Sequence, residues 1–179
     1  RIHAEWEKYR EILGQLAIKF INIPSENLTI AVEEALGTAA RLSNSDRAFA
    51  LRFDREAGLA HTDYAWVEEN LPSYKERFNV LPLGLFSHVL EELKSNGILE
   101  YEDIDQVDDS NPIKNVLFLL KIQSVVLLPI MEGTEFYGVV GFGKVQAKKK
   151  FSDSERVPVQ IASEIISNGL LRQKTENLL

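Results

Sequence analysis

Cysteine is absent from this sequence, and so are several short motifs that mark common enzymes. The lack of any cysteine among 179 residues excludes disulfides, thiolate metal sites, thiol catalysis and a cofactor attached through a thioether. The sequence also contains no GxSxG, GxGxxG or Walker motif and no HExxH or HxxxH pair. We therefore expect no enzyme activity, no metal site and no thiol-linked cofactor, and the identity of any other cofactor stays unknown.

Positive charge is scarce as well. The chain has 20 basic and 27 acidic residues, which gives a net charge of −7. Because a negative field repels phosphate backbones, we expect no direct binding of nucleic acid. The one basic run, residues 148–150, is interpreted as a solvated strand end, with a site for an anionic partner as the alternative. The acidic segment 102–110 lacks the glycine and the terminal glutamate of a calcium-binding loop, so we interpret it as a mobile, solvated loop.

No hydrophobic run is long enough to cross a bilayer. The longest candidate, residues 125–130, is far shorter than the roughly 20 residues that a membrane helix needs. The first ten residues are amphipathic and charged rather than a signal peptide, so we expect a cytoplasmic protein. The chain begins at Arg1 rather than at methionine, from which we expect it to be a segment of a longer protein.

The hydrophobic share of 45% and the charged share of 26% are typical of one globular domain, which we assign to residues 1–179. Hydrophobic periodicity divides this domain into helices and strands. The expected helices cover about residues 2–21, 28–42, 83–94, 112–121 and 153–176. The expected strands cover about residues 47–53, 59–67, 98–101, 124–130 and 136–145. Two strand pairs lie next to each other in sequence, which predicts hairpins and an antiparallel sheet.

Local signals sharpen this reading. Phe49, Leu51 and Phe53 alternate, so they are expected on one face of their strand. Three glycines within residues 136–145 predict a strand that coils sharply or lets another group approach its backbone. Ser152 and Glu155 have the spacing of a capping box, which predicts the start of the last helix. Residues 68–82 are polar and irregular.

Three stretches together resemble the GAF family of sensory domains. Residues 124–130 form a serine-led hydrophobic strand ending in Pro-Ile, and a glycine turn and the glycine-rich residues 137–142 follow it. Residues 151–155 resemble the family's entry to its last helix, and residues 64–66 stand where bacterial members carry an aromatic strand motif. The resemblance implies an α+β, GAF/PAS-like fold with a central antiparallel sheet of about six strands and helices on both sides.

The resemblance also implies a function. Family members are sensory modules of bacterial signalling proteins, such as histidine kinases of two-component systems or diguanylate cyclases. We therefore expect a module that binds a small molecule or relays a signal through its terminal helices, 2–21 and 153–176, to an output domain of the same polypeptide. These helices are also expected to hold a homodimer. The alternative is a ligand-free GAF domain that serves dimerisation, and an enzyme on a GAF-like scaffold is a less favoured third reading.

The family's better-known ligand signatures are incomplete in this sequence. Cyclic-nucleotide-binding members carry an Asn-Lys pair, a phenylalanine and an acidic pair. Here Lys114 and Asn115 stand in reversed order, and residues 119–122 after Phe118 are not acidic. Phytochrome-type members attach a bilin to a cysteine, which this chain does not have.

Five residues are candidates for a ligand pocket. Tyr64, Trp66, Tyr101 and Phe118 are large aromatics of the kind that line small-molecule pockets, although such residues also serve as ordinary core. His88 falls in the helix that borders the ligand cavity in the GAF family. It is a candidate hydrogen-bond donor or haem ligand, with an ordinary helix histidine as the alternative.

Overall fold

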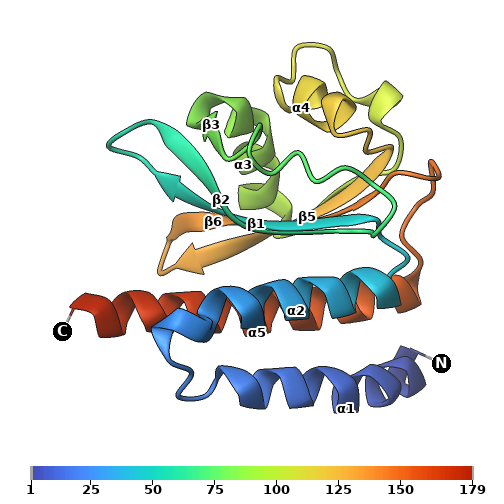
Figure 1. Ribbon diagram of the computed structural model, residues 1–179. Coiled ribbons are helices and arrows are strands. Elements are labelled where there is room, and N and C mark those ends of the chain that lie inside the picture. The colour runs from blue at the N-terminus through green and yellow to red at the C-terminus, as the bar shows by residue number, and fades with distance from the viewer. Residues whose placement is uncertain (1, 179) are drawn as a thin grey trace.

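The computed structural model describes residues 2–178, which form a six-stranded antiparallel sheet covered by helices on both faces (Figure 1). The sheet order is β3-β2-β1-β6-β5-β4. Its strands are β1 Arg47–Asp54, β2 Leu59–Val67, β3 Val80–Pro82, β4 Leu99–Tyr101, β5 Ser124–Glu132 and β6 Glu135–Lys144. The α-helices are α1 Ile2–Phe20, α2 Leu28–Leu42, α3 Ser87–Asn96, α4 Ile113–Leu119 and α5 Asp153–Leu178. Three short 3-10 helices are η1 Ser25–Asn27, η2 Leu83–Phe86 and η3 Ile104–Gln106. The predicted α+β class and sheet are confirmed.

The helices form unequal layers on the two faces of the sheet. α2 and α5 lie side by side against one face, and α1 lies beyond them as an outer layer (Figure 1). α3 and α4 cover the other face together with the loops around them (Figure 1). Each side has its own apolar core, because both faces of the sheet are withdrawn from water. The apolar stripe of α1, which includes Tyr9, Leu13, Leu16 and Phe20, is buried within this chain against the α2 and α5 layer.

The five strands expected from periodicity are all present, and the sixth was missed. β3 pairs with Leu59–His61 at the edge of the sheet and has only three residues. So short a strand shows no alternation, and Pro82 at its end is typical of an edge position. The helix expected at 83–94 begins as the 3-10 turn η2 and continues as α3, which Gly97 ends with a φ of 75°.

The acidic segment 102–110 is more structured than we expected from its composition. The Asp103 carboxylate accepts a hydrogen bond from the backbone N–H of Asp105 and thereby caps η3. Lys148, from the basic run, forms ion pairs with both Asp103 and Asp105. The acidic segment is therefore not solvated along its whole length, because the basic run supplies the opposite charge.

One irregularity decides which residues of β2 face which core. Ala50 pairs with Tyr64, but the next residue, Leu51, pairs with Thr62, so Asp63 is the extra residue of a β-bulge. On one side of the bulge Thr62 faces the α3 and α4 side, as its hydrogen bond to the Phe78 carbonyl shows. A strict two-residue alternation would put every even-numbered residue of β2 on that same side. The bulge reverses the alternation beyond this point.

Glycine in β6 permits two close approaches that no side chain would allow. A Cβ on Gly138 would lie 1.8 Å from the backbone oxygen of Leu51 in β1. A Cβ on Gly141 would meet the ring of Phe49 at 2.3 Å and the Leu127 side chain at 2.7 Å. The predicted close approach to this strand is thus confirmed, and Phe49 owes its position over the sheet to Gly141.

We predict that Gly138→Ala destabilises the protein by more than about 2 kcal/mol, because the added methyl group collides with backbone that cannot move away without breaking β1–β6 pairing. Chemical denaturation followed by circular dichroism measures this change. Gly14→Ala, in α1 where a Cβ meets no atom within 4 Å, is the control and should stabilise by about 0.5–1 kcal/mol. Equal stability of the two variants would contradict the account of Gly138.

Candidate functional site

An apolar pocket lies between the sheet and α4. Phe49 and Leu51 of β1 contribute to it together with Leu127 of β5, and Val116 and Leu117 of α4 lie over them. Leu81, Phe86 and the loop that carries residues 73–78 complete its wall. Aliphatic and aromatic side chains therefore form most of the lining, as in most small-molecule sites.

The pocket has room for a small molecule. Its empty space, counted together with its open mouth, is about 750 Å³. Small-molecule pockets in folded domains have volumes of roughly 300–1,000 Å³, so this space is of the usual size for such a ligand.

Arg47 is a buried charged residue at the edge of this pocket, and Lys75 of the neighbouring loop also lines it. Arg47 is only 4% exposed, and two of its nitrogens hold neighbouring backbone. Nε donates to the Leu120 carbonyl at 2.9 Å, and Nη1 donates to the Pro72 carbonyl at 2.8 Å. The guanidinium carbon lies 5.1 Å from the centre of the Tyr74 ring, within the range of a cation–π contact. Arg47 thus ties the end of α4 to the loop on the opposite side.

The third guanidinium nitrogen of Arg47 is buried without a partner. Nη2 has no hydrogen-bond acceptor within the part of the chain that the structure describes, and no carboxylate there forms an ion pair with the residue. Burial lowers the pKa of Arg47, while the nearby Tyr74 and Asp46 act in the opposite direction. Since a guanidinium stays charged in proteins, Arg47 is a buried cation without a full counter-charge.

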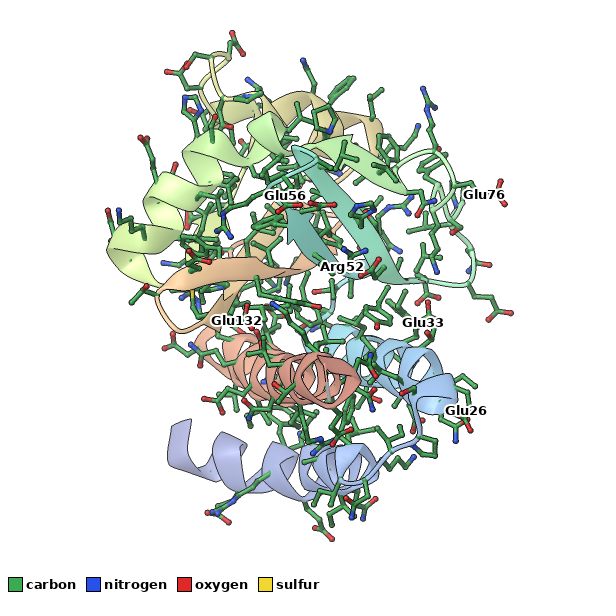
Figure 2. All side chains as sticks on the ribbon, turned by 90° about the vertical axis from the view of Figure 1, so that its left-hand side faces the viewer. Glu26, Glu33, Arg52, Glu56, Glu76 and Glu132 are labelled. Atoms are coloured by element: carbon green, nitrogen blue, oxygen red, sulfur yellow. The ribbon has the colours of Figure 1, made fainter. Side chains whose placement is uncertain are left out.

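The loop between β2 and β3, residues 68–79, forms one wall of the site. The Thr62 hydroxyl donates to the Phe78 carbonyl at 2.8 Å, and the rings of Tyr74 and Phe78 meet edge to face at 6.4 Å. Lys75 pairs with Glu33 of α2 at 3.5 Å, and Figure 2 shows Glu33 beneath the loop that carries Glu76. A segment that looked merely irregular in sequence therefore encloses the pocket.

Tyr64 and Trp66 face away from the pocket. Both side chains pack into the core between the sheet and α2, because the bulge at Asp63 reverses the alternation of β2. Trp66 borders the pocket from its strand, but its indole ring packs against Gly37 of α2. Burial, together with the charge of Asp63, raises the pKa of Tyr64 to about 12. Of these two predicted pocket residues, Trp66 borders the pocket and Tyr64 lies outside its lining.

The other three candidates lie outside the lining of this pocket. His88 is half-buried on α3 and contacts the Ser87 hydroxyl at 3.4 Å. The Tyr101 hydroxyl donates to Glu92 at 3.2 Å and accepts from Asn111 at 3.0 Å, and burial raises its pKa to about 12. Phe118 is 67% exposed on the outer side of α4. The five candidates therefore do not converge on one cavity.

The sequence gives only a weak indication of the residues that line the pocket. Phe49 and Leu51 alternate on one face of their strand, and Arg47, two residues before Phe49, lies on the same face. That alternation places a charged residue on a buried face, which is unusual enough to mark a candidate site. The contributions of Leu127 and Val116 depend on contacts between distant segments and leave no local pattern.

A buried ion pair joins the sheet to the last helix. Lys144 at the end of β6 contacts Glu155 in the first turn of α5 at 2.8 Å, and their side chains are 4% and 7% exposed. Asn44 donates to the other Glu155 oxygen at 2.8 Å. Ser152 and Glu155 exchange the two hydrogen bonds of the predicted capping box, at 3.0 and 3.1 Å.

This junction lies next to the pocket cation. Arg47 is paired with Gly143 across β1 and β6, one residue from Lys144. The carboxylate of Asp46, the residue before Arg47, accepts hydrogen bonds from the backbone N–H groups of Val145 and Gln146. Burial raises the pKa of Glu155, but its hydrogen bonds from Lys144, Asn44 and Ser152 outweigh burial and hold the pKa below the usual range.

Two further findings concern what the described residues, 2–178, contain. They include no group of three or more acidic or histidine side chains arranged to hold a metal ion. They also include no helix with the length and hydrophobicity needed to cross a membrane.

Solved structures share this architecture. The phycoerythrobilin-bound GAF domain from a cyanobacterial phytochrome superposes with a TM-score of 0.73 at 15% identity, over 94% of this chain and 97% of that one. The chain has the fold of a GAF domain. The blue-light absorbing form of the Thermosynechococcus elongatus PixJ GAF domain gives a TM-score of 0.64 at 16% identity, over 86% and 93% of the two chains.

A chromophore-binding domain of an unusual bacteriophytochrome from R. palustris has a TM-score of 0.71 at 10% identity. The match covers 94% of this chain but spans only 62% of that domain. No protein-family model matches the sequence, and no curated protein matches it either. At these identities the GAF fold is established and the chemistry of the site is not.

These structures correct the expectation about cofactors. The sequence leaves the cofactor unknown, and the missing cysteine predicts that no thiol-linked cofactor, such as the bilin of phytochrome-type members, is bound. The solved structures that share the GAF fold include a phycoerythrobilin-bound domain and chromophore-binding domains of bacteriophytochromes. The class of ligand must therefore follow from the lining of the pocket rather than from the missing cysteine.

We predict that Glu155→Gln destabilises the GAF fold by about 3 kcal/mol, because it leaves the Lys144 ammonium buried without its anion. Thermal and urea denaturation measure this loss. Because the pKa of Glu155 is lowered in the folded protein, the folded state becomes less stable in acid. Stability from the pair is present at neutral pH and is lost as the pH falls from about 4.3, the ordinary glutamate value, through the lower folded value.

The double variant Lys144→Met with Glu155→Gln is the control, since it removes both charges and keeps the helix cap. It should recover most of the lost stability. A double variant that is no more stable than Glu155→Gln would show that the cap and packing, rather than the unpaired charge, cause the loss.

Proposed function

We propose that this chain is a sensory and regulatory module that binds a small molecule in the apolar pocket between the sheet and α4. The observation that carries the proposal is the pocket itself, which has an apolar lining, a cation at its edge and a loop as a separate wall. Pockets of this kind are the usual small-molecule sites of folded domains. The likeness to GAF domains that are chromophore-bound adds support from the fold alone.

The bound state would be relayed to α5 through the end of the sheet. Arg47 lies at the pocket and pairs across the sheet with Gly143, and the adjacent Lys144 holds Glu155 at the start of α5. A ligand that prefers one position of Arg47 and its loop would thus bias the start of α5. In this proposal α1 and α5 carry the change to an output domain of the same polypeptide.

The proposal extends to the longer protein of which this domain would be a part. Residues 1–179 would be a single domain of a bacterial signalling protein in the cytoplasm, such as a histidine kinase or a diguanylate cyclase. We propose binding rather than catalysis. In support, the Thr62 hydroxyl donates to a backbone carbonyl and Lys75 pairs with Glu33, so two of the polar groups at the pocket already have partners.

Ala65→Phe tests the pocket. Ala65 lies at the pocket opposite Phe49, so a ring in its place would occupy the free space while the fold remains. His61→Phe is the matched control, because His61 pairs with Arg52 and adds the same ring to the other face of β2. We expect small apolar ligands to raise the melting temperature of the native chain and of His61→Phe, but not of Ala65→Phe. Equal responses in all three proteins would rule out this pocket.

Dimerisation through the terminal helices is the second candidate function. The stripe of α1 that suggested it, including Tyr9 and Leu13, is used within the chain. What favours an external partner is Ile12, which is 43% exposed, and Ile18, which is 67% exposed on α1. We propose that these residues contact a second copy.

Ile18→Glu should therefore shift a dimer to monomer in sedimentation equilibrium, since the introduced charge would be buried in the contact. Ile30→Glu on α2 is the control, because Ile30 is also 67% exposed but lies on another helix. A chain that sediments as a monomer at every concentration would refute dimerisation through α1.

A further inference from the structure

The buried charges at the end of the sheet differ in one respect. Lys144 on β6 has the carboxylate of Glu155 at 2.8 Å, so its charge is matched within the protein. Arg47 on the neighbouring strand is 4% exposed, yet its partners are two neutral carbonyls and an aromatic ring. Its Nη2 is buried without an acceptor. Buried charges are normally paired, and an unsatisfied buried donor destabilises the folded state.

Arg47 is also fixed in place. Nε and Nη1 are held by carbonyls on two different segments, at Leu120 and Pro72, and both segments border the pocket. A guanidinium held in this way is preorganised, so little conformational entropy is lost when it binds an anion. The structure therefore provides a fixed cation at the edge of an apolar cavity.

The rest of the lining restricts the ligand further. No aspartate or glutamate lines the pocket, so a ligand with an ammonium group has no counter-charge there. Phe49, Leu51 and Leu127 offer an apolar surface to the body of a ligand. The empty space of about 750 Å³, counted with the open mouth, is of the size that small-molecule pockets have, roughly 300–1,000 Å³.

Resting on the proposed function of this pocket, we propose that its ligand is a small monocarboxylate whose carboxylate binds Arg47 and whose aliphatic or aromatic body lies against Phe49, Leu51 and Leu127. The carboxylate supplies the acceptor that Nη2 lacks. Arg52, on the same strand, does not compete for it, because Arg52 lies on the other face and pairs with Asp63 at 2.8 Å (Figure 2).

Paired ligands test this inference on the native chain without any mutation. The probes are 4-methylpentanoate and phenylacetate, each compared with its primary amide, which has nearly the same shape but no charge. Isothermal titration calorimetry should show each carboxylate binding about tenfold or more tightly than its amide, because a charge-assisted hydrogen bond is stronger than a neutral one.

Two arginine variants locate the effect. Arg47→Gln should lower carboxylate affinity about tenfold or more and leave amide affinity nearly unchanged, whereas Arg52→Gln should change neither. Circular dichroism checks that both variants are folded. A carboxylate preference that survives in Arg47→Gln would overturn the assignment to Arg47.

The remaining outcomes separate this inference from the function it rests on. If amides and carboxylates bind the native chain equally and Ala65→Phe blocks both, the pocket is a ligand site but Arg47 does not select the ligand. If neither class binds the native chain, both the ligand class and the binding function of this pocket are refuted.

Discussion

Burial of both faces of one sheet is the constraint on which the rest of this structure depends. Side chains along each strand point alternately to the two apolar cores, so a one-residue shift in a strand changes which side chains each core contains. In β2 the bulge at Asp63 produces such a shift. Without it, Tyr64 and Trp66 would point to the α4 side and fill the space that the small side chain of Ala65 leaves open. The pocket therefore exists because of a single extra residue.

The same constraint explains why the site is built around a charge. Arg47 shares the parity of Phe49, so it is drawn onto a buried face at the point where β1 begins. Its carbonyl partners stabilise the loop and the end of α4, but neutral partners do not balance a full positive charge. Lys144, one strand away, shows the balanced arrangement with Glu155. Lys144 therefore has a counter-charge within the protein, whereas Arg47, at the pocket, has none among the described residues.

The GAF fold carries ligands of different chemistry because the scaffold and the lining are separable. The solved structures compared above share the fold at 10–16% identity. In this chain Gly141 lets Phe49 lie over the sheet, where it lines the pocket. The apolar lining and the cation of the pocket, rather than the fold, therefore favour an anionic ligand with an apolar body. Arg47 pairs across the sheet with Gly143, and the adjacent Lys144 contacts Glu155 at the start of α5.

The sequence by itself determined the helices, five of the six strands and their order, because periodicity, turns and caps are local properties. The hairpins at β1–β2 and β5–β6 and the Ser152–Glu155 cap were all predictable for that reason. Tertiary structure alone decided the site. The bulge at Asp63 arises from pairing with β1, and an alternation counted along one strand cannot reveal it. The partners of Arg47 lie 25 and 73 residues away, so only the folded chain shows that one of its nitrogens is left without an acceptor.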